Sequence, residues 1–474
     1  MESTLSGRDR GCPILGALAV AVAALVGAAS VSGAGVARVA EAASHGNELP
    51  RKGYLGLRLA PLPTDAGARE KLGAVAGVVV EGVVPGTTAE VSGIQAGDVL
   101  VAMDGKTIIG VVDMMSRVGG LATGRRFELT LLRDGKRMTL PVTLRERPRD
   151  KGANFDVLYE HVVSRGARIR VLVSRPHAPG RHPALVLMQG LGPATVDAPL
   201  SGPEPYSRIL ADFAQRGWVT VRVERPGIGD SEGGPFADVD FEADLDAFRR
   251  ALGSVRAYSF VNPDDVFVFG HSLGGVFAPI LAAEVPVRGI AVYGTVAKTW
   301  PEYFLETWRR QSLLAGDDPS AIDTAQRHLA VALHELLVRR RPLDEVFRTR
   351  PDLRPLLAKL APGGRIVGRS LTFWTQLTAR SLPAAWAKGH ASVLAIWGTN
   401  DFVSSRDDHA FIAEIVNRGR AGTGAFVALE GADHGFWRTT SIEDSYRRGS
   451  AGGEFNADIV TTLREWTEKV RAGR

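Results

Sequence analysis

The sequence Val266-Phe267-Val268-Phe269-Gly270-His271-Ser272-Leu273-Gly274 decides the fold. It begins with an unbroken apolar run, which indicates a buried strand, and a helix-compatible segment (275–284) follows it. A serine with a glycine two positions away on either side, between a strand and a helix, is typical of a sharp turn that exposes a nucleophilic hydroxyl. The helix would also point backbone N–H groups towards developing negative charge. We therefore predict that Ser272 is a nucleophile, with a plain glycine turn as the alternative.

Strand and helix patterns alternate around this turn. Residues 157–163 and 168–174 have the pattern of a hairpin. Further strands are expected at 184–188, 218–223, 287–293, 393–397 and 425–429, and helices at 206–216, 241–258 and 455–471. This alternation predicts an α/β fold with a mostly parallel sheet, and we assign residues 156–474 to this domain.

The strand signal disappears between about residues 298 and 389. Helical periodicity, several prolines and four of the eight tryptophans occupy this segment. It predicts a helical cap inserted over the active site. The tryptophans would line an acyl or aromatic-substrate pocket, because such sites are mostly apolar, or they would serve ordinary helix packing. They are Trp300, Trp308, Trp374 and Trp386.

Ser272 needs a base, and that base needs an orienting acid. Asp401 stands in the loop after the expected strand 393–397, and His434 stands in the loop after the next strand. We predict that Asp401 and His434 complete a catalytic triad.

Other candidates near these positions receive different roles. Asp407, Asp408 and His409 are expected at a helix start, where acids are stabilised by the helix dipole. Asp433 would cap its own loop, and the His271 ring should turn away from the serine. His328 and His334 are expected on exposed helix faces.

The tetrahedral intermediate of such a reaction needs an oxyanion hole. One donor is expected to be the backbone N–H of Leu273, directly after the nucleophile. The other is expected to be Leu191 in the loop Gln189-Gly190-Leu191-Gly192, which follows strand 184–188. A glycine turn without this function is the alternative.

Residues 51–147 show short strands separated by glycines. Strands are expected at 54–59, 77–84, 98–103, 127–133 and 137–144, with a helix near 111–121. Asp134-Gly135 predicts a tight hairpin between the last two. Residues 145–154, with Pro148 and Gly152, are typical of a linker, and we place the linker proper at 148–155.

This segment resembles a PDZ domain of the bacterial, protease-associated type. The resemblance is carried by Gly53-Tyr54-Leu55-Gly56-Leu57 and by Gly93-Ile94-Gln95-Ala96-Gly97-Asp98-Val99-Leu100 with Met103-Asp104-Gly105. It implies a loop formed by Tyr54, Leu55, Gly56 and Leu57 that holds a peptide's terminal carboxylate beside a strand edge. A packing module that binds only its own catalytic domain is the alternative.

The second half of the chain resembles the α/β-hydrolases, in which nucleophile, acid and histidine follow in this order. The resemblance rests on the turn at Ser272, on 189–193 and on Arg225-Pro226-Gly227-Ile228-Gly229-Asp230-Ser231-Glu232-Gly233. These stretches resemble secreted bacterial carboxylesterases with an N-terminal accessory domain. Gln189 stands where a histidine is commoner, and Pro226 where an arginine is more usual; neither touches the triad.

The N-terminus has the pattern of a secretory signal peptide, residues 1–42. Arg8 and Arg10 precede an uncharged stretch (11–37), and Ala40-Glu41-Ala42 offers a cleavage site. An exported protein, periplasmic or secreted, is expected; an uncleaved leader would instead anchor it to the membrane. The single cysteine, Cys12, lies in this leader, so the mature chain would have neither a thiol nucleophile nor a thiolate metal site.

Composition and motifs argue against a nucleic-acid-binding protein and against a metal- or cofactor-dependent enzyme. The formal charge of +5 is small for 474 residues and the basic residues are scattered, which disfavours nucleic-acid binding. Phosphate-loop, dinucleotide and zinc-protease motifs are absent from the sequence, and no cofactor or metal is expected. The expected activity is hydrolysis of small carboxylic esters. A serine peptidase on the same fold and a PDZ-based binding protein with a vestigial hydrolase domain are the alternatives.

Overall fold

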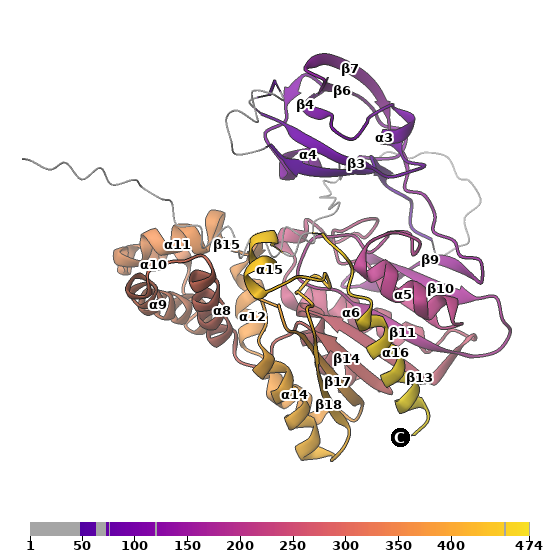
Figure 1. The fold of residues 1–474 in the computed structure, drawn as a ribbon, viewed down its shortest axis with the longest axis vertical. Helices are drawn as coiled ribbons and strands as arrows, with labels where there is room; N and C mark the ends of the chain where they lie inside the picture. Colours follow the sequence, from indigo (N-terminus) through magenta and orange to yellow (C-terminus); the bar gives the residue numbers. More distant parts are fainter. Residues whose placement is uncertain (1–47, 63–72, 75, 119–120, 450–451, 474) are drawn as a thin grey trace, which may run out of the picture.

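The computed structural model describes residues 48–62, 73–74, 76–118, 121–449 and 452–473. The expected leader and Cys12 lie outside this part of the chain. Two domains are visible: a small β-rich domain and a larger domain built on a single sheet (Figure 1). No helix within the described residues is long and apolar enough to cross a membrane.

The larger domain contains an eight-stranded sheet in the order β18-β17-β14-β13-β11-β12-β10-β9. The hairpin β9–β10 is antiparallel and β10 runs antiparallel to β12, whereas all other neighbours are parallel. Its strands are β9 (Phe155–Ser164), β10 (Ala167–Pro176), β11 (His182–Met188), β12 (Val219–Val223), β13 (Val261–His271), β14 (Gly289–Tyr293), β17 (Ser392–Gly398) and β18 (Gly424–Leu429). The predicted α/β fold class is confirmed.

Helices cover both faces of this sheet because its central strands are apolar on both sides. One core packs α6 (Phe241–Val255), α7 (Leu273–Ala282) and α14 (Arg406–Gly419) against the sheet. The other packs α5 (Pro205–Gln215) and α16 (Asp458–Arg471) on the opposite face. A short helix, α15 (Ile442–Arg448), was not expected from the sequence.

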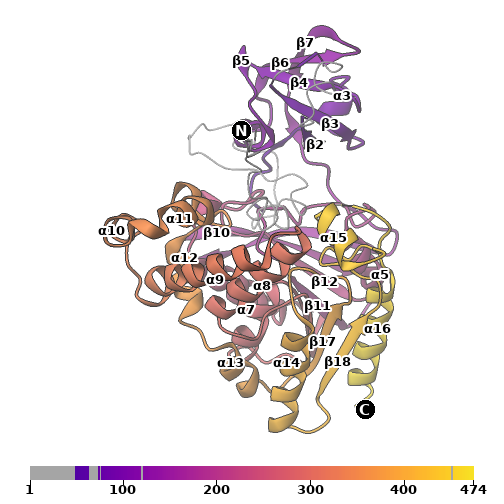
Figure 2. The ribbon, with the colours of Figure 1, turned by 60° about the vertical axis from the view of Figure 1, so that its left-hand side comes forward.

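The segment between β14 and β17 forms the cap, mainly helical as expected (Figure 2). Its helices are α8 (Trp300–Leu314), α9 (Pro319–Leu333), a π-helical turn (His334–Val338), α10 (Leu343–Thr349), α11 (Arg354–Leu360), α12 (Leu371–Thr378) and α13 (Leu382–Lys388). The expectation of no strands was wrong in one place. Arg365–Ile366 (β15) pairs with Arg369–Ser370 (β16) around a two-residue turn, Val367-Gly368, with positive φ at both positions. Strands of two residues are too short to show an alternating pattern.

The small domain holds an antiparallel sheet in the order β2-β3-β4-β6-β7, with β5 added to β4. Its strands are β2 (Leu57–Pro61), β3 (Val78–Val83), β4 (Val99–Met103), β5 (Lys106–Thr107), β6 (Arg126–Arg133) and β7 (Lys136–Thr143). Two helices, α3 (Thr88–Val91) and α4 (Val111–Val118), complete it. This arrangement confirms the predicted small β domain.

Two details of the small domain differ from expectation. The strand expected over 54–59 is broken, because Gly56 has φ +81° and separates β1 (Gly53–Tyr54) from β2. The stretch 145–154 is not all linker, since β8 (Arg145–Glu146) pairs with β1. Arg145–Glu146 is a strand because it pairs with β1, and its composition gives no sign of this pairing.

The two domains contact each other through the chain just before β1. Arg51 forms buried ion pairs with Asp197 and Asp230, and Lys52 donates from Nζ to the carbonyl oxygen of Gly229 at 2.7 Å. Asp197 lies on the segment that continues from the loop after β11, so this contact ties the small domain to the site described next.

Candidate active site

Ser272 lies at the turn between β13 and α7. Its φ of 53° and ψ of −120° are a strained conformation for a residue other than glycine. The turn demands glycine beside it, because a Cβ at Gly274 would lie 1.8 Å from the carbonyl oxygen of Met188. Ser272 is held on both sides: its N–H donates to Tyr293 O at 2.8 Å, and its carbonyl accepts from Thr295 Oγ1 at 2.9 Å.

Asp401 and His434 are directly hydrogen bonded. The distance from His434 Nδ1 to Asp401 Oδ2 is 2.9 Å, and both side chains are buried. Asp401 follows β17, and His434 lies in the loop after β18, so adjacent parallel strands deliver both side chains to the same sheet edge. Asp401 is further held by Ser404, whose Oγ donates to Oδ2 at 2.6 Å and whose N–H donates to Oδ1 at 3.0 Å.

The two side chains shift each other's pKa in opposite directions. Burial alone would raise the pKa of Asp401, but the His434 charge and the hydrogen bonds from His434 and Ser404 hold it well below its usual range. Burial alone would lower the pKa of His434, but the Asp401 carboxylate raises it above its ordinary value. The Asp401 carboxylate therefore stays ionised, and its charge makes the neighbouring His434 imidazole more basic.

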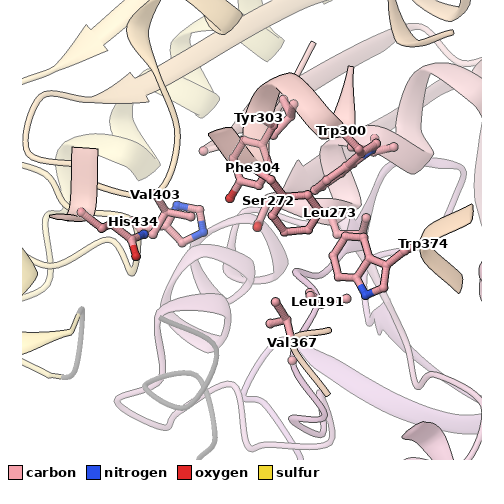
Figure 3. Close-up of a pocket in the computed structure, with 15 residues that line it drawn as sticks. Leu191, Ser272, Leu273, Trp300, Tyr303, Phe304, Val367, Trp374, Val403 and His434 are labelled. Atoms are coloured by element: carbon pink, nitrogen blue, oxygen red, sulfur yellow. The ribbon is translucent and has the colours of Figure 1, made fainter. Parts of the chain in front are cut away.

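Ser272 and His434 line the same cavity (Figure 3). Its volume is about 60 Å³. Aliphatic and aromatic side chains from the sheet edge and from the cap form most of its wall. The lining residues are Leu191, Gly192, Ser272, Leu273, Val276, Gly294, Val296, Trp300, Tyr303, Phe304, Gln311, Val367, Trp374, Val403 and His434.

The cap tryptophans divide between the two roles considered for them. Trp300 and Trp374 line the cavity and contact each other edge to face, with ring centroids 5.3 Å apart. Trp308 and Trp386 are buried in the packing of the cap and do not line it. Val367, at the tip of the hairpin that sequence reasoning missed, also lines the cavity.

Leu191 and Leu273, the expected oxyanion donors, line this cavity together. Leu273 is the first residue of α7, so its N–H has no partner inside the helix. The loop of Leu191 is fixed by Arg225, which donates to the carbonyl oxygens of Gln189 and Leu191, each at 3.0 Å. Within the described residues, no acceptor is bonded to the Leu191 N–H.

A buried tyrosine links this loop to the nucleophile turn. Gly190 N–H donates to Tyr206 Oη at 3.2 Å, and Tyr206 Oη lies 2.5 Å from His271 Nδ1. The His271 ring therefore points into the interior, away from the cavity, as expected. Sequence reasoning missed Tyr206 and the role of Arg225, because no local pattern marks a helix residue or a loop arginine that reaches a distant backbone.

The competing acids and histidines lie where the sequence placed them. Asp407, Asp408 and His409 occupy the first turn of α14. Asp433 caps its own loop, since its Oδ1 accepts from the N–H groups of Gly435 and Trp437, each at 2.8 Å. Burial raises the pKa of Asp433 to about 6. His328 and His334 are exposed. No group of three or more His, Cys, Asp or Glu side chains in the described residues is arranged to hold a metal ion.

The expected carboxylate loop of the small domain lies between β1 and β2. Tyr54 pairs in β1 and stacks under the Arg147 guanidinium, 3.9 Å from the ring centroid, while Leu55 and Leu57 are buried. A Cβ at Gly56 would lie 2.1 Å from Thr87 Oγ1, so only glycine fits there. β2 is an edge strand, and α4 packs against it.

Comparison with known proteins agrees with both domains. A model described as the alpha/beta hydrolase family matches residues 185–441. This chain belongs to the alpha/beta hydrolase family. A PDZ-domain model matches residues 53–144, so this alpha/beta hydrolase carries an N-terminal PDZ domain.

Two curated relatives match a short part of this alpha/beta hydrolase. The probable periplasmic serine endoprotease DegP-like of Chlamydia trachomatis serovar D is 32% identical over 103 residues, which are 22% of this chain and 21% of that protein. Serine endoprotease DegS of Escherichia coli K12 is 33% identical over 100 residues, 20% of this chain and 27% of that protein. The chain thus spans about a fifth to a quarter of the length of these relatives.

Among solved structures, Est1E from Butyrivibrio proteoclasticus is similar to the alpha/beta hydrolase at 13% identity. The match covers 67% of this chain and 99% of that chain, with a TM-score of 0.40. Carboxyl esterase 2 from the fungus Tuber melanosporum is also 13% identical, covering 68% of this chain and 89% of that chain, with a TM-score of 0.40.

Proposed function

We propose that this alpha/beta hydrolase is a serine esterase, which cleaves carboxylic esters through an acyl-enzyme. The observation that carries the proposal is the 2.9 Å hydrogen bond between Asp401 and His434 beside the cavity that Ser272 lines. A buried carboxylate that orients an imidazole next to an exposed-hydroxyl turn is the arrangement that activates a serine.

In the proposed reaction, Ser272 Oγ attacks the ester carbonyl while His434 Nε2 accepts its proton. Asp401 holds Nδ1–H, so that Nε2 is the free base. The N–H groups of Leu273 and Leu191 stabilise the oxyanion of the tetrahedral intermediate. His434 then protonates the departing alcohol, and a water deprotonated by His434 hydrolyses the acyl-enzyme and restores the serine.

The test is hydrolysis of p-nitrophenyl acetate and butyrate by the chain and by Ser272→Ala. We expect turnover by the parental chain and loss of it in the variant. Ser320→Ala, an exposed serine at the start of α9, is the matched control and should keep full activity. A fluorophosphonate probe should label the parental chain but not Ser272→Ala. Unchanged turnover in Ser272→Ala would refute the assignment.

The peptidase alternative is separated by assaying peptide p-nitroanilides in parallel. The small, mostly apolar cavity favours a short acyl group over a peptide. A clear preference for the amide substrates would favour the peptidase over the esterase. Labelling by the fluorophosphonate probe would count against a vestigial hydrolase domain.

We also propose that the PDZ domain binds a peptide C-terminus. Within the described residues, one edge of β2 is unpaired and offers backbone groups for an added strand, and α4 forms the opposite wall. Peptides from a C-terminal library should bind the chain with a free carboxylate and not when amidated. Equal binding of both forms would show that the carboxylate is not recognised, and binding of neither would leave the domain a packing module.

Export to the periplasm or medium is a further part of the proposal, and it rests on the leader pattern of residues 1–42. Cell fractionation of chains with and without these residues tests it. A membrane-bound product that keeps the leader would support the anchor alternative.

A further inference from the structure

The wall of the active-site cavity holds a buried amide, that of Gln311, in which neither polar atom has a hydrogen-bond partner within the described residues. Gln311, on α8, lines the cavity and is 1% exposed. Neither its Oε1 nor its Nε2 is hydrogen bonded within the described residues. A buried amide without partners is unfavourable, so a glutamine at this place indicates a ligand group that satisfies it.

The position of Gln311 on α8 accounts for its orientation. Trp300, Phe304 and Gln311 recur at helical spacing and all three line the cavity. Two members of this stripe are aromatic and close the wall, whereas the third presents an amide. A second buried glutamine of the cap, Gln326 on α9, differs in that its Nε2 donates to Leu305 O at 2.8 Å. Of these two buried cap glutamines, the one in the cavity lacks a partner within the described residues and the one outside it does not.

The chemistry of the wall defines the group that would bind there. No Asp, Glu, Lys or Arg lines the cavity, so a charged substituent would be buried without a counter-charge. The amide offers one acceptor and one donor group, which a hydroxyl can use together because it both donates and accepts. The matching substituent is a neutral hydroxyl.

The cavity has room for a substituent beside Ser272. A single water needs about 10–15 Å³, and the cavity of about 60 Å³ is several times larger. This space is compatible with a short acyl chain that carries one hydroxyl.

From these observations we infer that Gln311 is a specificity-determining residue, and that the natural substrate is an ester of a short hydroxyacyl group. The inference rests on the proposed esterase function. The Gln311 amide binds the acyl hydroxyl while Ser272 attacks the carbonyl of the same group. An alkyl ester of equal length leaves the amide unpaired and is therefore cleaved less efficiently.

The test compares paired methyl esters by acid release: butyrate with 3-hydroxybutyrate, pentanoate with 3-hydroxypentanoate, and hexanoate with 6-hydroxyhexanoate. We expect kcat/KM to be at least about tenfold higher for the hydroxy member of one or more pairs, equivalent to about 1.4 kcal/mol. Gln311→Met, which keeps length but removes both hydrogen-bonding groups, should bring the ratio of kcat/KM between the hydroxy and the plain ester close to one. Because the preference is a ratio within one preparation, partial unfolding of a variant does not affect it.

Gln326→Met is the control for loss of a buried cap glutamine, and its hydroxyl preference should equal that of the parental chain. Cleavage of plain esters without a hydroxyl preference would overturn the inference and leave the esterase proposal intact. So would a preference that survives in Gln311→Met and is lost in Trp300→Phe, because the unpartnered Trp300 Nε1 would then be the recognising group. No cleavage of any ester would overturn both.

Discussion

His271, the residue before the candidate nucleophile, is hydrogen bonded through Nε2 to the main-chain oxygen of His434 at 3.0 Å. Burial and the neighbouring His434 charge hold the pKa of His271 well below its ordinary value, so the ring is neutral. A carbonyl can only accept, which makes Nε2 the donor and Nδ1 the acceptor from the Tyr206 hydroxyl. The nucleophile turn thus holds the loop that carries the candidate base.

We predict that His271→Phe lowers kcat/KM for p-nitrophenyl butyrate about 10- to 100-fold. The substitution removes the donor to the His434 carbonyl and the acceptor of the Tyr206 hydroxyl proton, a loss of about 1–3 kcal/mol. His271→Gln keeps an amide donor and should recover part of the rate. The exposed His328→Phe is the control and should match the parental chain.

If His271 positions the base, the kinetic constants should be affected unequally. The loss in His271→Phe should fall on kcat more than on KM, because the base is displaced while the cavity wall is retained. Equal rates in the phenylalanine and glutamine variants would show that the hydrogen bond to His434 contributes nothing.

Asp401→Asn should reduce kcat on the order of 10³- to 10⁴-fold. An amide cannot accept the Nδ1–H of His434 as a carboxylate does, and the imidazole loses its orientation and its charge partner. Asp407→Asn, six residues further along the chain, is the matched control: its side chain is 91% exposed, and activity should not change. A large effect of Asp407→Asn together with a small effect of Asp401→Asn would indicate that Asp407 in α14, and not Asp401, is the catalytic acid.

The pH dependence follows from the raised pKa of His434. Only the neutral imidazole can accept the serine proton, so kcat/KM should rise with pH and reach half its maximum above the ordinary histidine value of about 6.5. Asp401→Asn removes the carboxylate that raises this pKa, so its residual activity should have a midpoint at lower pH. A midpoint that stays fixed or moves upward in Asp401→Asn would contradict this electrostatic account.

The sequence predicted those parts of the site that local patterns determine. Ser272, Asp401 and His434 each follow an apolar strand, and parallel strands bring their ends to one sheet edge. Gln311 could not be found in this way, because which face of a cap helix meets the cavity depends on packing between distant helices. The same holds for Arg225, whose carbonyl partners in the loop of Leu191 lie more than thirty positions earlier in the chain.

The contact between the domains provides a stability prediction. Arg51 is buried against Asp197 and Asp230, so Arg51→Ala would leave two buried carboxylates short of a counter-charge. Arg147 and Arg170 remain close to them, at 3.8 and 3.1 Å, and compensate in part. We expect a loss of about 3 kcal/mol, at the lower end of the cost of breaking a buried pair.

Thermal unfolding and limited trypsin digestion measure this effect. Arg51→Ala should unfold at a temperature several degrees lower and be cut faster after Arg149 and Lys151; Arg147 precedes Pro148 and is not a trypsin site. Arg125→Ala is the matched control, because its pair with Asp104 is 3.6 Å long and about half exposed on both sides; it should change neither readout. If Arg51→Ala behaves like this control, the buried ion pairs do not hold the PDZ domain against the hydrolase domain, and other contacts, such as those of Lys52 and Arg147, do so.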